Sequence, residues 1–248
     1  MSRKVQKLLY GFLLVLFAAV FVYSAYRLIA YYSAKHESDR VVAEAQRYVS
    51  RPEGTGLDKE EEKERLVVDF DQLKAINEDV VGWLYCAGTH INYPVVQAAD
   101  NEYYLYRLVD RTWNENGSLF LDYRSPDDFS GINNIIYGHH MRSGAMLADL
   151  TKYKTQSFYD EHPSMYLATP QQHYRLDLFA GCVVSGADSI YMGNVTQDIL
   201  QRCFNYSTFR SQFDEVPEGR VLTLSTCSYE YEEARYVVMG VLVPLEED

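Results

Sequence analysis

The feature that most constrains this chain is an uncharged apolar run near its N-terminus, LLYGFLLVLFAAVFVYSAY, at residues 8–26. As a helix, a run of this length spans about 28 Å, close to the ~30 Å hydrocarbon core of a bilayer. It is preceded by three basic residues, Arg3, Lys4 and Lys7. Basic residues flank membrane helices on the cytoplasmic side. The pattern predicts a single-pass plasma-membrane protein with a cytoplasmic tail at 1–7, a transmembrane anchor at 8–32 and an extracytoplasmic remainder.

Two alternatives explain this run less well. A cleaved signal peptide has an apolar region of about 7–15 residues and an A-x-A-like cleavage site, whereas this run is longer and lacks a clean site. The core helix of an ordinary soluble domain has a polar side, whereas this run is apolar on all sides. We therefore expect an uncleaved anchor.

Residues 33–68 are polar and rich in charge, and we expect them to form a stalk. The stretch DRVVAEAQRYV is compatible with a short helix, which SRPEGTG interrupts, and LDKEEEKER is a solvated run of charge. This segment is predicted to lift the following domain away from the membrane.

Residues 69–248 have the pattern of one β-rich domain. DFDQLKAIN and TQDILQRCFNYSTFRSQF have helical periodicity. Most of the remainder alternates short β-rich runs with turn residues, among them INYPVVQ, NNIIYGHH, RVLTLSTC and RYVVMGVLVPL. Regular alternation of strands and helices is absent. The pattern predicts a mostly β fold, with an antiparallel sheet or a barrel.

The charge of this part of the chain argues against one class of partner. Residues 66–248 hold 12 basic and 26 acidic side chains, a net charge of −14. Such a surface repels phosphate backbones, so we expect no nucleic-acid partner.

The cysteines argue against a metal centre. There are four of them, Cys86, Cys182, Cys203 and Cys227. They form no C-x-x-C pair, and no cluster of cysteine and histidine has the spacing of a zinc site. A domain of this size folds on its hydrophobic core without disulfides. We expect no metal, no cofactor and four free thiols.

One of these thiols lies at a strand end. Cys227 closes the apolar run VLTLST, and Arg235 opens the next run, RYVVMGVLV. Two strands joined by so short a loop pair antiparallel, so the end of one lies beside the start of the other. A guanidinium beside a thiol lowers the pKa of the thiol or stabilises an oxyanion formed where the sulfur attacks. On this evidence alone, Cys227 is either a nucleophile or a buried structural cysteine.

Thiol chemistry usually needs an acid or a base as well. Of the six histidines, His139 and His140 stand out, because they follow an apolar strand and a glycine in IIYGHHM. A histidine in this position is placed like a site residue. The others lie in the stalk, in polar loops or at strand starts, where a surface histidine is the simpler interpretation.

TLSTC followed by EEARYVVMG, together with IIYGHHM upstream, resembles the sortases, the membrane-anchored cysteine transpeptidases of Gram-positive bacteria. The stretches LKAINEDVVGWLYCAGTHINYPVVQAADNEYYL and GSLFLDYRS are similar to class B members in particular. The resemblance covers residues 69–245. It implies an eight-stranded β-barrel with short peripheral helices.

The resemblance also implies roles for individual residues. Cys227 matches the nucleophile, His139 the general acid and base, and Arg235 the residue that stabilises the oxyanion or positions the substrate. Ser225 and Thr226 match positions expected to bind substrate. His140 is the weaker candidate for the base, because the family histidine follows the glycine directly.

The implied reaction has two stages. The thiolate attacks a threonine carbonyl in the C-terminal sorting signal of a secreted protein and forms a thioester. An amine of a peptidoglycan cross-bridge, of lipid II or of a pilin then takes the acyl group. Two alternatives stay open at this point: an extracytoplasmic cysteine peptidase that mainly hydrolyses, and an inactive anchored interaction module.

Overall fold

The computed structural model describes residues 3–50, 66–192 and 195–245. The chain divides into two compact units, residues 1–40 and 41–248. Most of helix α1 (Arg3–Gln46) makes up the first unit and contains the predicted anchor. An 18-residue window of α1 has a mean hydropathy of 2.3 and is not buried anywhere. By length and composition, α1 is able to cross a membrane.

Helix α1 also includes the first part of the predicted stalk, since it continues to Gln46. The breaker SRPEGTG and the charge run LDKEEEKER lie almost wholly outside the described residues. Val41, Ala45 and Leu66 are buried together with Leu73 in one apolar cluster of the second unit. The compact unit therefore begins N-terminal to the predicted boundary at Asp69, and the limits of tail, anchor and stalk stay predictions.

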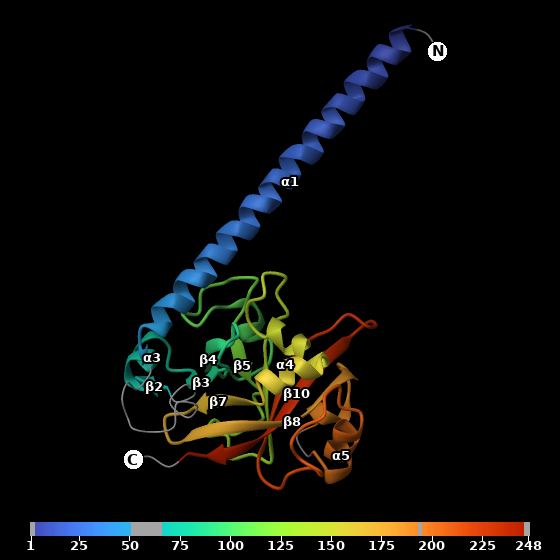
Figure 1. The fold of residues 1–248 in the computed structure, drawn as a ribbon. Helices are drawn as coiled ribbons and strands as arrows, with labels where there is room; N and C mark the ends of the chain where they lie inside the picture. The colour runs from blue at the N-terminus through green and yellow to red at the C-terminus, as the bar shows by residue number, and fades with distance from the viewer. Residues whose placement is uncertain (1–2, 51–65, 193–194, 246–248) are drawn as a thin grey trace. The chain divides into compact units, whose positions relative to one another are not determined.

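A closed barrel forms the centre of the second unit (Figure 1), with the strand order β10-β8-β7-β3-β4-β5-β6-β9. The strands are β3 (Val80–Tyr85), β4 (Asn92–Val96), β5 (Leu119–Leu121), β6 (Asn133–Tyr137), β7 (Ser164–Ala168), β8 (His173–Ser185), β9 (Val221–Cys227) and β10 (Ala234–Pro244). Neighbours run antiparallel except for the pairs β4–β5 and β6–β9. The predicted mostly β barrel is confirmed.

Short elements surround the barrel. They are β1 (Val49–Ser50), β2 (Val67–Val68), α3 (Phe70–Ile76), η1 (Tyr103–Tyr106), η2 (Ala148–Lys154), α4 (Gln156–Glu161), η3 (Ser189–Tyr191) and α5 (Gln197–Asn205), where η marks a 3-10 helix. The predicted helix at the start of the domain is α3, and its N-cap Asp69 accepts a hydrogen bond from the Gln72 amide. Helix α5 packs against β8 and is shorter than the periodicity predicts, because it ends at Asn205.

The two faces of β9 show how the barrel places its side chains. Leu222 and Leu224 belong to the core inside the barrel, whereas Val221 packs outside with Leu200 and Cys203 of α5. Side chains alternate with a period of two along a strand, and each buried leucine contributes about 1.5–3 kcal/mol of burial free energy. Alternation therefore turns Cys227 to the outer side of the barrel.

Candidate active site

Cys227 ends β9, and Arg235 is the second residue of β10. The register of the two antiparallel strands places them directly opposite each other. The side chains of an opposed pair project from the same face, with Cβ atoms about 5 Å apart. The strands thus bring the thiol and the guanidinium together, as the loop length predicts. Cys227 is also only partly buried, whereas the other three cysteines are buried.

The loop between these strands is tied down at both ends. Lys154 of η2 donates to the Ser228 hydroxyl at 3.0 Å and pairs with Glu230. The hydrogen bond from Lys154 lowers the pKa of Glu230 to about 2. At the other end, the Glu233 carbonyl accepts from the Gly186 amide at 2.8 Å. These contacts therefore fix the conformation of the loop that follows Cys227.

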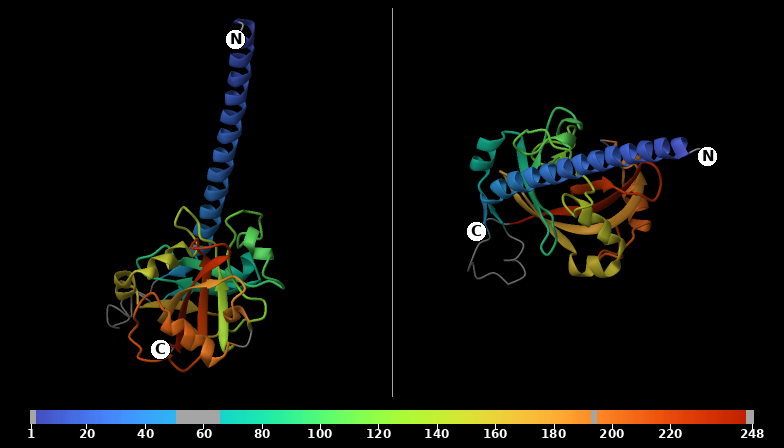
Figure 2. Two further views of the ribbon diagram at one scale, coloured as in Figure 1. Left: turned by 90° about the vertical axis from the view of Figure 1, so that its right-hand side faces the viewer. Right: turned by 90° about the horizontal axis from the view of Figure 1, so that it is seen from above.

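His139 reaches the same place from a distant part of the chain. Strand β6 pairs in parallel with β9, as the left panel of Figure 2 shows for the yellow-green strand beside the red C-terminal strands. Tyr137 lies opposite Ser225, and the Gly138 amide donates to the Ser225 carbonyl at 3.1 Å. His139 is the next residue, so it emerges beside the end of β9.

Gly138 has a packing role beside His139. A Cβ at position 138 would lie 2.4 Å from Leu119 Cδ2 and 2.7 Å from Leu147 Cγ, which leaves no room for any side chain. The glycine therefore permits the close backbone approach that the sequence predicted. The His139 ring is in turn held by the Leu105 carbonyl oxygen, 2.8 Å from Nε2.

Cys227, His139 and Arg235 all line one cavity of about 500 Å³. Its volume is typical of ligand pockets. Part of its lining comes from Phe120 of β5 and Tyr137 at the end of β6. Another part comes from the segment 186–192, which we call the η3 wall, through Gly186, Ala187, Asp188, Tyr191 and Met192.

The guanidinium of Arg235 lies at the rim of this cavity. Nη1 donates to the Ala234 carbonyl at 3.1 Å, and Nη2 is 3.5 Å from a Glu233 carboxylate oxygen. The side chain is 30 % exposed, so an incoming carbonyl has access to it. A planar fork of N–H donors is suited to an oxyanion.

Comparisons with known proteins agree with this geometry. The sortase domain family matches residues 84–243. Sortase B of Listeria monocytogenes is 31% identical over 249 residues, which cover 97% of this chain and 99% of the relative. Sortase B of Staphylococcus aureus is 31% identical over 188 residues, covering 73% and 77% of the two chains. The chain belongs to the sortase family.

Solved structures extend the comparison to the fold. The crystal structure of Staphylococcus aureus sortase B superposes with a TM-score of 0.67 at 30% identity, and covers 71% of this chain and 87% of that one. A Bacillus anthracis protein similar to sortase B gives a TM-score of 0.71 at 30% identity, with 85% and 98% covered. This sortase is thus a class B enzyme, a cysteine transpeptidase with the eight-stranded barrel of its family.

His140, the second histidine of the sortase motif, faces elsewhere. Its Nδ1 lies 3.0 Å from the carbonyl oxygen of Cys227, and its ring is 5.4 Å from that of Tyr229. A carbonyl only accepts, so Nδ1 donates in this contact. His140 therefore holds the backbone of Cys227 and does not line the cavity.

Ser225 and Thr226, the predicted substrate-binding residues, both line the cavity but are buried and already hydrogen-bonded. The Thr226 hydroxyl donates to the Gly138 carbonyl at 2.8 Å. The Ser225 hydroxyl is 2.8 Å from that of Tyr191. Their direct role in this sortase is to join the walls of the cavity, and substrate binding by either residue stays a prediction.

The cavity lining also includes residues that were not individually predicted from the sequence: Asn101, Arg124, Tyr137, Asp188 and Tyr191. They come from loops or strand ends with no periodic pattern. Burial raises the pKa of Tyr137 and of Tyr191 well above the ordinary value, so both are neutral hydrogen-bonding groups at physiological pH. Three of these residues lie in stretches that carry the family resemblance: Asn101 in LKAINEDVVGWLYCAGTHINYPVVQAADNEYYL, Arg124 in GSLFLDYRS and Tyr137 in IIYGHHM. Nothing in those stretches indicates that these side chains line a cavity.

The described part of the sortase offers no metal centre. Within residues 3–50, 66–192 and 195–245, no three His, Cys, Asp or Glu side chains are grouped so as to hold an ion.

Proposed function

We propose that this sortase cleaves the C-terminal sorting signal of secreted proteins after a threonine and transfers the acyl group to an amine. One observation carries the proposal: Cys227 lies opposite Arg235 in register, and His139 follows the neighbouring strand into the same cavity. Nucleophile, proton carrier and oxyanion donor are the three groups that acyl transfer through a thioester requires.

In the first stage, the Cys227 thiolate attacks the threonine carbonyl and the C–S bond forms. Arg235 donates to the oxygen as negative charge develops on it. His139 gives a proton to the leaving amine, the peptide bond breaks and the thioester remains. In the second stage His139 takes a proton from the acceptor amine, which attacks the thioester and releases the thiolate.

The contact between His139 and Leu105 supports this assignment of the proton. Because the Leu105 carbonyl only accepts, Nε2 carries a hydrogen in this contact. Nδ1 is then the ring nitrogen that exchanges protons with the reacting groups.

The acceptor we propose is a primary amine of a peptidoglycan cross-bridge, of lipid II or of a pilin. A sortase B has been crystallised in complex with triglycine, a peptide that ends in such an amine, and that structure is 30% identical to this chain with a TM-score of 0.65. A Staphylococcus aureus sortase B–substrate complex is also known, with a TM-score of 0.67. These similarities favour an amine acceptor over water.

We also propose that α1 anchors the enzyme in the plasma membrane, with residues 1–7 in the cytoplasm and the catalytic domain outside. The apolar composition of α1 and the basic residues that precede its apolar run support this orientation. Secreted substrates would then meet the cavity of the catalytic domain on the outer side of the plasma membrane.

The test is a peptide-library assay on the full chain in detergent micelles, with and without triglycine. We expect cleavage after threonine and, with triglycine, a ligated product of the corresponding mass. Hydrolysis products alone at every amine concentration would favour the peptidase alternative, and no cleavage at all would favour the inactive module.

A pair of cysteine variants completes this test. Cys227→Ala should abolish turnover and leave the melting temperature nearly unchanged, because the thiol is at the surface of the cavity. Cys86→Ala removes a buried thiol outside the cavity lining and should retain turnover. Turnover by Cys227→Ala would overturn the assignment of the nucleophile.

A further inference from the structure

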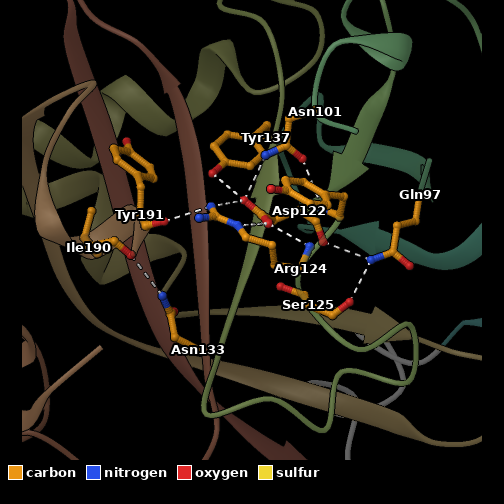
Figure 3. Close-up of polar contacts among 10 residues, drawn as sticks. Gln97, Asn101, Asp122, Arg124, Ser125, Asn133, Tyr137, Ile190 and Tyr191 are labelled. Carbon is orange, nitrogen blue, oxygen red and sulfur yellow. Dashed lines mark hydrogen bonds and ion pairs between the residues drawn. The ribbon is translucent and has the colours of Figure 1, made fainter. Parts of the chain in front are cut away.

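A buried carboxylate lies directly behind the wall of the cavity (Figure 3). Asp122 follows β5 and is 1% exposed. Its carboxylate accepts hydrogen bonds from the Asn101 amide at 2.9 Å and from the Tyr137 hydroxyl at 3.0 Å. Both of these donors line the cavity. Asp122 therefore joins two parts of the wall without lining the cavity itself.

Arg124 neutralises this carboxylate and reaches beyond it. Its Nε and Nη2 donate to the two oxygens of Asp122 at 2.9 and 2.7 Å. Nη2 also donates to the Tyr191 carbonyl at 2.8 Å, 67 residues further along the chain. The planar guanidinium makes both contacts at once, which a single ammonium group does not reproduce. Arg124 thus connects the β5 side of the cavity to η3.

The η3 side of the cavity has other attachments as well. The Gly186 amide donates to the Glu233 carbonyl at 2.8 Å, and Asn133 donates to the Ile190 carbonyl at 3.3 Å. Arg202 pairs with Asp188 at 2.5 Å, and the Ile190 side chain is fully buried.

The Tyr191 hydroxyl meets Ser225 at 2.8 Å, and its ring stacks on Tyr137 with centroids 6.0 Å apart. Asp188, before η3, caps the Ile190 amide at 3.0 Å. The contact with Arg124 is the one that ties the Tyr191 carbonyl, at the C-terminal end of η3, to the buried carboxylate of Asp122.

We propose that Asp122 and Arg124 are positioning residues that set the η3 wall, residues 186–192, and so determine how tightly the sorting signal binds. This inference rests on the proposed function for its substrate. It follows from the geometry that loss of the pair loosens the C-terminal end of η3 at Tyr191, while the strands that carry the proposed reacting groups keep their register. Loss of the pair is then expected to weaken substrate binding and to leave the rate of the chemical step unchanged.

A purely structural role would give a different result. A second pair in the same domain has nearly the same geometry: Arg175 and Asp177 are two residues apart, joined through Nε at 2.7 Å and Nη2 at 3.1 Å. The two arginine side chains are similarly exposed, at 39% and 40%. Arg175 does not line the cavity, so Arg175→Gln is a matched control for the loss of such a pair.

The experiment compares Arg124→Gln, Arg124→Lys and Arg175→Gln in the full chain. Arg124→Gln leaves the buried Asp122 carboxylate without its cationic partner. The double variant Asp122→Asn/Arg124→Gln is therefore included, because it removes both charges of the pair. For both Arg124 single variants and the double variant we expect KM for the best library peptide to rise about tenfold, with kcat within twofold. Alkylation of Cys227 by iodoacetamide, a reagent too small to need the wall, should keep its rate.

Hydrogen exchange gives a readout that needs no turnover. The amides of Tyr191 and Met192 bond to carbonyls within the wall at 3.1 and 3.0 Å. We expect exchange across residues 186–192 to quicken about tenfold in the Arg124 variants and to stay unchanged in Arg175→Gln.

Three results would overturn the proposal: unchanged exchange in the wall, an unchanged KM, or equal effects in Arg175→Gln. If the wild type cleaves no peptide, the proposed function fails, while the exchange measurement still decides whether Arg124 positions the wall.

Discussion

The two sides of the cavity are held by different kinds of interaction. Cys227, His139 and Arg235 lie on or directly after paired strands, where backbone hydrogen bonds and the barrel core fix their positions. The wall of residues 186–192 lies outside the strands, as a turn and a short 3-10 helix. Side-chain contacts of Asp188, Arg124 and Tyr191 hold it, together with the buried Ile190 and the bond from the Gly186 amide to the Glu233 carbonyl. The proposed reacting groups are therefore part of the strand framework, whereas the η3 wall is attached to it.

From this difference we expect the chemical step to depend on the strand side of the cavity, and substrate binding to depend on the η3 wall. Strand register in a closed barrel changes only if many hydrogen bonds break together, so the reacting groups keep their geometry. A wall held by a few side-chain contacts shifts when one of them is lost, since each such bond contributes only about 0.5–1.5 kcal/mol. Mutations on the strand side should act on kcat, and mutations on the wall side should act on KM.

The largest effect is expected from His139→Ala. Loss of a general acid and base costs about 10³-fold in rate, and this should appear in kcat with KM nearly unchanged. Single-turnover thioester formation measures it. Full activity of the variant would remove His139 from the mechanism and make His140 the next residue to test.

Arg235→Lys should lower kcat about 10²-fold. The positive charge remains, but a point charge does not reproduce the guanidinium fork at the oxyanion. Arg210→Lys, on a residue outside the cavity lining, is the control and should be neutral. Near-normal rates in Arg235→Lys would exclude the oxyanion role.

His140→Ala tests whether the strand side depends on one side chain. It removes the donor to the Cys227 carbonyl and should lower kcat about tenfold, as the end of β9 loosens. His140→Asn should restore most of the rate, because its amide supplies an N–H donor at a similar position. If both variants lose activity equally, the ring is needed for something other than this hydrogen bond.

Tyr191→Phe makes a minimal change in the wall. It removes the hydroxyl that meets Ser225 and keeps the ring that stacks on Tyr137. We expect KM to rise about threefold at constant kcat, in line with one neutral hydrogen bond. Tyr206→Phe, at a residue that is 77% exposed, should show no change. A fall in kcat would contradict the division between the two sides.

The smallest effect concerns stability, and it appears only in acid. Burial alone would raise the pKa of Asp122, but the hydrogen bonds from Arg124, Asn101 and Tyr137 outweigh it and lower the pKa from 3.8 to about 2. The stabilisation is therefore complete above about pH 4 and is lost as the pH falls through 2.

Thermal unfolding from pH 5 to pH 2 measures this loss. The melting temperature of the wild type should exceed that of Asp122→Asn by about 5 °C at pH 5, and the difference should shrink towards pH 2. A difference that does not depend on pH would mean that the charge of Asp122 contributes nothing to the wall.

The strand side was open to prediction from sequence, and the wall was not. Cys227 and Arg235 are joined by a short loop, so their pairing follows from the hairpin rule. His139 and His140 were singled out by the glycine and the strand end before them, and the family resemblance favoured His139. The strand beside it in space, β9, is more than 80 residues further along the chain and pairs in parallel with β6. No local sequence pattern predicts this pairing. The family resemblance, and not periodicity, is what predicted that His139 and Cys227 belong to one site.

The wall lies beyond such reasoning for a physical reason. Tyr191 ends the short helix η3, and Arg124 and Asn101 lie in loops, so their contacts depend on how the barrel places three segments that are distant in the sequence. Asp122 gives no sign in the sequence of being buried, since its environment exists only after β5 and β6 have paired. The length of α1 was likewise underestimated, because the polar residues after the anchor continue the helix to Gln46.

The pairing of Cys227 with Arg235 also sets what evolution or protein engineering can change here. A one-residue deletion within β9 would turn the thiol from the cavity to the inside of the barrel, because side chains alternate along a strand. Residues added between Ser228 and Glu233 leave the register of both strands as it is. The proposed catalytic pair is thus intolerant of length changes within β9. Length changes in the following loop keep the pair in register and act instead on the contacts of Lys154 with Ser228 and Glu230.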